Sequence, residues 1–218
     1  MNEEAVGRAV KRANDDEITT RDELFITTKI WVQGMTDEET AYQAMKDYFA
    51  AYRGMERAYR EGLVHAVGVA NFFPETLTNL CETVDVIPAV NQVELHLFFV
   101  QEAAVQNMKA YAVIPQAWGP LAEGKHGIFT DPELTVIGKK YGKTAAQVAL
   151  RWNTQRGVSI IPKSTHVERL EQNLDIWDFS LTDDEMKTVA SKDLGHSEII
   201  NHYDPALVKF LDNMKIYD

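Results

Sequence analysis

The sequence is poor in cysteine, in net positive charge and in long apolar runs. Its single cysteine, Cys81, excludes an intramolecular disulfide and any metal site built from several cysteines. Lys and Arg total 22 against 33 Asp and Glu, so the formal net charge is −11. Such a balance disfavours nucleic acid or an anionic membrane as a partner, although a local basic pocket for an anionic cofactor remains compatible with it.

Targeting signals are also missing from the sequence. No apolar run approaches the roughly 20 residues that a transmembrane helix needs. The first residues, 1–4, carry no basic region followed by an apolar one, which a secretory signal requires. We therefore expect a soluble protein of the reducing cytoplasm.

What the chain does contain is an alternation of short apolar runs with longer amphipathic stretches. Its 218 residues are 45% hydrophobic, which is enough to bury a sizeable core. The expected strands are 24–28, 64–69, 88–95, 113–118 and 159–162. The expected helices are 74–81, 101–111, 131–141, 144–156, 167–174 and 182–190, the last opened by a capping box of Thr182 and Glu185. This alternation predicts a parallel α/β sheet or barrel, and with no linker in sight we expect one domain over 1–218.

The stretch 39–62 needs a prediction of its own. Apolar residues from Ala41 to Tyr59 recur at spacings of three and four, which is typical of one long amphipathic helix. A continuous helix there leaves about five strands, too few for a complete (β/α)8 barrel of ~250 residues. We therefore expect an incomplete barrel, with a helix over 39–62.

Several stretches resemble the aldo-keto reductases, especially prokaryotic members similar to diketogluconate reductases. In chain order they read NEEAVGRA at 2–9, RDELFITTKIW at 21–31, YRGME at 52–56, GVANF at 68–72, PAVNQVELH at 88–96, QAWGPL at 116–121, KTAAQVALRW at 143–152 and IPKSTH at 161–166. They follow the order of the family and span nearly the whole chain. The resemblance implies a TIM-barrel-derived α/β fold that binds NADP(H) and reduces aldehydes and ketones to alcohols.

The resemblance also implies which residues carry the chemistry. The family uses an Asp, a Tyr, a Lys and a His, because hydride transfer to a carbonyl needs an acid for the oxygen and a cation that lowers the pKa of that acid. Only the lysine has a counterpart, Lys29, and Trp31 is expected to line the substrate pocket. The Asp and Tyr of the family precede the segment that matches Asn2, and its His lies on a strand between the segments that match Met45 and Asp47, where this chain runs on directly.

The cofactor-binding residues are better represented. By resemblance, Asn71 and Gln92 contact the nicotinamide carboxamide and Trp118 stacks on its ring. Further residues line the pyrophosphate path, hold the adenosine 2′-phosphate and face the adenine. In that order they are Gly119, Pro120 and Leu121; Lys163, Ser164 and Arg169; and Gln172 and Asn173. The basic side chains in this set favour NADP(H) over NAD(H), and no metal ligand is implied.

The same residues also have structural explanations. Taken without the family, Lys29 is a solvent-facing lysine at a strand end, Asn71 belongs to a turn and Trp118 packs in a core. His96, His166 and Cys81 are interpreted as structural.

Three hypotheses therefore stay open: an NADPH-dependent carbonyl reductase, a non-catalytic NADP(H)-binding remnant, and a truncated form of an aldo-keto reductase. The expected partner is a small carbonyl compound. A monomer and a homodimer both fit.

Overall fold

The fold is known from a computed structural model that describes residues 3–27, 29, 51–197, 199–200, 206 and 209. The helices are α1 (Glu3–Asp15), α3 (Pro74–Cys81), α4 (Glu102–Ala110), α5 (Pro132–Tyr141), α6 (Ala145–Gln155), α7 (Val167–Leu174) and α8 (Asp183–Ala190). The strands are β1 (Gly68–Ala70), β2 (Val90–Glu94), β3 (Ile114–Trp118) and β4 (Ser159–Ile160), and short 3-10 helices cover Arg21–Glu23 and Ala122–Gly127. Residues 51–60 are also helical. No described helix has the length and apolarity required to cross a membrane.

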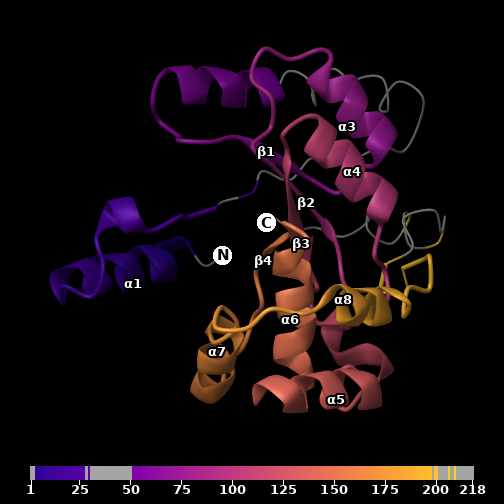
Figure 1. The fold of residues 1–218 in the computed structure, drawn as a ribbon. Coiled ribbons are helices and arrows are strands. Elements are labelled where there is room, and N and C mark those ends of the chain that lie inside the picture. The colour runs from indigo at the N-terminus through magenta and orange to yellow at the C-terminus, as the bar shows by residue number, and fades with distance from the viewer. Residues whose placement is uncertain are drawn as a thin grey trace.

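The four described strands form one parallel sheet in the order β1-β2-β3-β4. Consecutive strands are neighbours and all point the same way; one α-helix connects β1 to β2 and β2 to β3, whereas α5 and α6 both lie between β3 and β4 (Figure 1). This arrangement is that of a (β/α)8 barrel of which the described part contains successive units. The predicted fold class, an α/β fold derived from a barrel, is confirmed.

Helices cover one face of the sheet. Against the strands, α3 and α4 pack through Leu77, Val105 and Met108, which meet Val93 and Ala117. Because successive side chains of a strand point to opposite faces, the residues on either side of Val93 and Ala117 face away from these helices. That second face carries polar side chains, among them those of Gln92 and Gln116.

A second apolar cluster joins α5, α6 and α8. Trp152 of α6 is fully buried there, beside Leu134 and Val189. By contrast, α1 lies to one side of the sheet (Figure 1), and its described side chains are exposed or half-buried.

The helix predictions agree with the structure more closely than the strand predictions. The capping box of Thr182 and Glu185 is present at the start of α8. The predicted buried strand at 24–28 is wrong for its described residues: 24–27 form no strand, and Phe25 is 77% exposed. An apolar run becomes a strand only beside another strand, and none lies beside it in the part of the chain that the structure describes.

The remaining strands are shorter than expected. The strand predicted at 64–69 begins only at Gly68, and β4 ends at Ile160 rather than at residue 162. The helix predicted over 39–62 is present over 51–60, whereas 39–50 lie outside the described residues. The assignment of 1–218 to a single domain stays a prediction.

Candidate functional site

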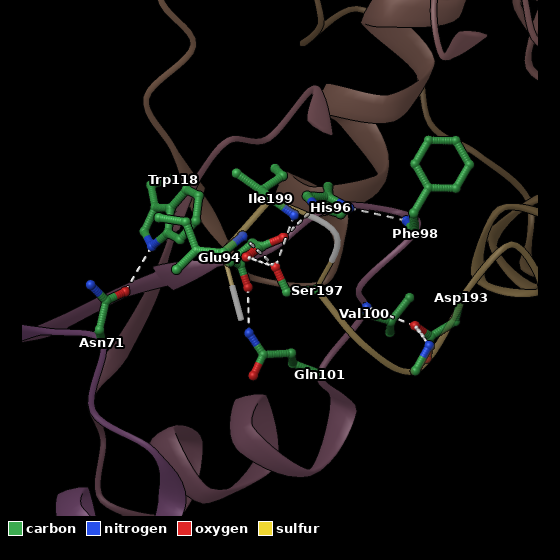
Figure 2. Close-up of polar contacts among 12 residues, drawn as sticks. Asn71, Glu94, His96, Phe98, Val100, Gln101, Trp118, Asp193, Ser197 and Ile199 are labelled. Atoms are coloured by element: carbon green, nitrogen blue, oxygen red, sulfur yellow. Dashed lines mark hydrogen bonds and ion pairs between the residues drawn. The ribbon is translucent and has the colours of Figure 1, made fainter. Parts of the chain in front are cut away.

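Two of the predicted site residues and a buried carboxylate lie where the parallel strands end. Asn71 follows β1, Glu94 ends β2 and Trp118 ends β3. The carboxyl ends of parallel strands lie at the same edge of a sheet, which is where active sites of barrel folds are built. The indole Nε1 of Trp118 donates a hydrogen bond of 2.8 Å to Oδ1 of Asn71, so two of the predicted cofactor residues are brought together (Figure 2).

A buried amide fixes the loop that carries Asn71. Asn91 is 0% exposed, and its side chain bonds both backbone groups of Phe72: Oδ1 accepts from the N–H at 3.3 Å and Nδ2 donates to the carbonyl at 2.8 Å. Asn71 itself adopts the left-handed conformation with φ of 58°, which asparagine tolerates better than most residues. The side chain of Asn91 thus fixes the turn from the sheet side. The exposed side chain of Asn71 faces the strand ends.

Lys29 and Gln92, both predicted site residues, are also in contact. The ammonium of Lys29 donates to Oε1 of Gln92 on β2, across 63 positions of sequence. Although the residue as a whole is exposed, partial desolvation of the ammonium lowers the pKa of Lys29. Nε2 of Gln92 donates in turn to Oε1 of Gln116 at 2.6 Å.

Beside this pair lies a buried carboxylate to which the sequence motifs gave no role. Glu94 is 3% exposed, and both of its oxygens are occupied (Figure 2). Nδ1 of His96 accepts from the backbone N–H of Phe98 at 3.2 Å, so its Nε2 carries the hydrogen and donates to Glu94 at 2.9 Å. The hydroxyl of Ser197 donates to the other oxygen at 2.6 Å. His96 therefore supports the carboxylate, in keeping with its interpretation as structural.

Ser197 also orders the segment that covers this edge. Its Oγ accepts from the backbone N–H groups of Ile199 and Ile200 at 3.1 and 3.0 Å. Sequence reasoning missed Ser197, because a serine outside the family-like motifs, 103 positions from its partner Glu94, carries no local signal of that contact.

A cavity of about 350 Å³ opens between these elements. Its size lies within the ~300–1,000 Å³ that is usual for small-molecule pockets. Aromatic and polar side chains contribute about equally to the wall. The lining residues are Asn71, Phe72, Phe73, Val93, Glu94, Phe99, Gln101, Trp118, Gly195, His196, Ser197 and Ile200.

The predicted pyrophosphate residues lie directly after β3. Gly119 has a φ of 60°, so a side chain there would be strained, and a Cβ would lie 3.6 Å from Cδ1 of Ile199. Pro120 is buried and Leu121 is half-buried. The backbone is therefore open at Gly119, next to the stacking residue Trp118.

The predicted phosphate and adenine residues lie in the loop after β4 and on α7. Lys163, Arg169 and Gln172 are exposed, whereas Ser164 and Asn173 are half-buried. Oγ of Ser164 accepts from the backbone N–H of His166 at 3.1 Å. Trp31, the expected substrate residue, lies outside the described residues.

Comparisons with known proteins agree with this arrangement. The model of the Aldo/keto reductase family matches residues 41–194. Methylglyoxal reductase DkgA of Escherichia coli (strain K12) is 34% identical over 215 residues, which cover 89% of this chain and 77% of that protein. A 9,11-endoperoxide prostaglandin H2 reductase of Trypanosoma cruzi is 33% identical over 210 residues, covering 86% and 73%.

Solved structures are similar as well. An aldo-keto reductase of the silkworm Bombyx mori (AKR2E4), in complex with NADP, has a TM-score of 0.80 at 28% identity, covering 92% of this chain and 78% of that one. Another from Bombyx mori (AKR2E5) has a TM-score of 0.79 at 29% identity, covering 88% and 71%. The family match, the identity to DkgA and the shared fold together show that the chain belongs to the aldo/keto reductase family of oxidoreductases.

Proposed function

We propose that the protein binds NADP(H) and acts as an NADPH-dependent oxidoreductase that reduces small aldehydes and ketones to alcohols. The observation that carries this proposal is the contact of Asn71 and Trp118 at the strand ends, with Gln92, which Lys29 bonds, two residues before the end of β2. The relatives support it, since several are named reductases and one structural relative is an aldo-keto reductase in complex with NADP.

The side chains fit the nicotinamide end of such a cofactor. Trp118 offers a half-buried indole that lines the cavity, and a flat ring can stack on it. Its bond to Oδ1 of Asn71 leaves Nδ2 of that amide as a donor for a carboxamide oxygen. When bound, the cofactor supplies the hydride. Asn71 and Gln92 then orient its carboxamide.

At the adenosine end of the cofactor, exposed basic side chains are suited to bind a phosphate. Lys163 and Arg169 flank the start of α7, where the helix dipole also favours negative charge. Charge-assisted bonds from both would hold a 2′-phosphate, which NADH lacks.

Lys29 is the residue that we place in the chemistry. Its ammonium lies beside Gln92 of β2, and positive charge there would stabilise a carbonyl oxygen that gains negative charge. Because desolvation lowers the pKa of Lys29, the ammonium is a better proton source near neutral pH than an ordinary lysine.

One observation favours a second candidate, a non-catalytic NADP(H)-binding protein. Desolvation lowers the pKa of Lys29, and among the described residues no carboxylate or phenol pairs with its ammonium. An acid tuned by this lysine therefore has no counterpart in that part of the chain.

Both candidates bind NADP(H), so calorimetric titration with NADPH and NADH first tests whether the protein has a cofactor site. We expect NADPH to bind roughly tenfold or more tightly than NADH, because hydrogen bonds to charged groups contribute about 1.5–3 kcal/mol each. Lys163→Met with Arg169→Met should remove this preference. Lys139→Met, which changes an exposed lysine on α5, is the matched control.

Oxidation of NADPH with small aldehydes then decides between the two candidates. Turnover that Lys29→Met abolishes supports the reductase. Binding without turnover supports the non-catalytic protein, and failure of wild-type protein to bind either nucleotide contradicts both.

A further inference from the structure

One layer of the sheet is polar where barrels are usually apolar. Ala70, Gln92, Gln116 and Ser159 are register partners across β1, β2, β3 and β4. They face away from the helices, since the alternate residues Val93 and Ala117 of β2 and β3 pack against α3 and α4. Layers inside a barrel are normally filled by bulky branched apolar side chains. Two amides and a hydroxyl in one layer therefore require an explanation.

The hydrogen bonds in this layer all run in one direction. An ammonium can only donate, so Lys29 must face the oxygen of the Gln92 amide. This turns Nε2 of Gln92 toward Gln116, whose Oε1 accepts at 2.6 Å, and leaves Nε2 of Gln116 to donate to Oγ of Ser159 at 3.3 Å. Rotating the amide of Gln92 by half a turn would place donor against donor at Lys29 and acceptor against acceptor at Gln116.

Within this row of hydrogen-bonded side chains, Gln92 is the only residue to which the resemblance gives a cofactor contact. Its side-chain amide would bind the carboxamide of the nicotinamide. Such a contact depends on which end of the side chain carries the oxygen. Lys29 determines that orientation from one side. From the other side it depends on Gln116, which reaches Gln92 from the neighbouring strand and is itself anchored by Ser159.

We propose that Gln116 is a positioning residue for nicotinamide recognition: it holds the Gln92 amide in the single orientation that accepts from Lys29 and can pair with the cofactor carboxamide. The proposal rests on the proposed binding of NADP(H). It assigns Gln116 no contact with the reacting atoms, and it places the effect at the nicotinamide end of the nucleotide alone.

Two nucleotides separate this role from a general one in folding. NADPH carries the nicotinamide, whereas adenosine 2′,5′-bisphosphate carries the 2′-phosphate and the adenine without it. Gln116→Leu keeps the volume and removes both amide groups. We expect it to raise the Kd of NADPH about tenfold, the factor that corresponds to fixing one glutamine side chain, and to leave the Kd of the bisphosphate unchanged.

Conservative and distant variants complete the design. Gln116→Glu still presents an oxygen to Nε2 of Gln92, so NADPH affinity should be retained. Gln106→Leu is the matched control, because it removes an exposed glutamine of α4 that bonds only the neighbouring Glu102 in the described structure. If Gln116→Leu does not fold, Ser159→Ala frees the same amide from its far end and should shift NADPH affinity in the same direction.

Equal weakening of both nucleotides by Gln116→Leu would mean a structural role and overturn the proposal. Unchanged binding of both would overturn it too, while leaving the proposed function standing. If the wild-type protein binds the bisphosphate but not NADPH, the nicotinamide site itself is refuted. If it binds neither, the proposed function fails and this inference fails with it.

Discussion

Glu185 should make the stability of the protein depend on pH. The residue is 6% exposed and joins α8 to α5, where Lys140 donates to one oxygen at 2.8 Å and the hydroxyl of Tyr141 to the other at 2.6 Å. The backbone N–H of Thr182 donates at 2.9 Å within the capping box. Burial opposes ionisation, but these donors outweigh it and lower the pKa of Glu185 to about 2.

The sign and size of the effect follow from this shift. The ordinary pKa of the group is 4.5. Because the folded-state pKa is depressed, the stabilisation is complete above pH 4.5 and is lost as the pH falls through 2. It amounts to about 3 kcal/mol at neutral pH and about 1 kcal/mol at pH 3. These are upper bounds, since the side chain of Lys140 is 58% exposed and its contribution is screened.

Urea unfolding of Glu185→Gln at pH 7 and pH 3 tests this reasoning. The variant should lose about 2–3 kcal/mol of unfolding free energy at pH 7 and only about 1 kcal/mol at pH 3. Asp184→Asn, an exposed carboxylate beside it on the same helix, is the control and should change stability by less than about 1 kcal/mol. An equal loss at both pH values would show that the carboxylate acts through packing, not through its charge, and would refute the argument.

Two further substitutions test packing and the wall of the cavity. Gly138→Ala should destabilise the protein by about 2 kcal/mol or more in urea unfolding, because a Cβ there would lie 2.3 Å from the carbonyl oxygen of Lys143; a stability close to that of wild type would mean that this backbone gives way. Ser197→Ala should cost about 1–3 kcal/mol, because it removes one donor from the buried carboxylate of Glu94. It should also speed proteolytic cleavage near residues 195–200, and an unchanged cleavage rate would contradict the role given to this contact.

Local signals allowed the helices from α3 to α8 to be predicted, whereas α1 was not predicted. The capping box of Thr182 and Glu185 determines where α8 begins, and it involves neighbours in sequence only. The run 24–28 is as apolar as a strand, yet pairing with a neighbour decides whether it forms one, and a single sequence does not display pairing. Residues 24–27 are consequently not a strand.

The site was predictable only to the extent that family-like motifs covered it. The resemblance indicated Asn71, Gln92 and Trp118, and the structure brings Asn71 and Trp118 into contact. It gave no role to Gln116 or Ser197. The contacts of these two residues depend on strand register and on a return of the chain over 103 positions, neither of which leaves a periodic pattern in the sequence.

The hydrogen bond between Lys29 and Gln92 has a thermodynamic consequence for how the protein responds to a ligand. It joins the N-terminal part of the chain to a sheet that begins at residue 68. A nucleotide that requires the resulting orientation of Gln92 binds the joined arrangement better than the separated one. By reciprocity, attachment of the segment raises the affinity for the nucleotide by the same factor by which the bound nucleotide raises the equilibrium constant for attachment. Hydrogen exchange around residues 24–27 should therefore slow when NADPH is added, because the ligand stabilises the attachment of that segment to the sheet.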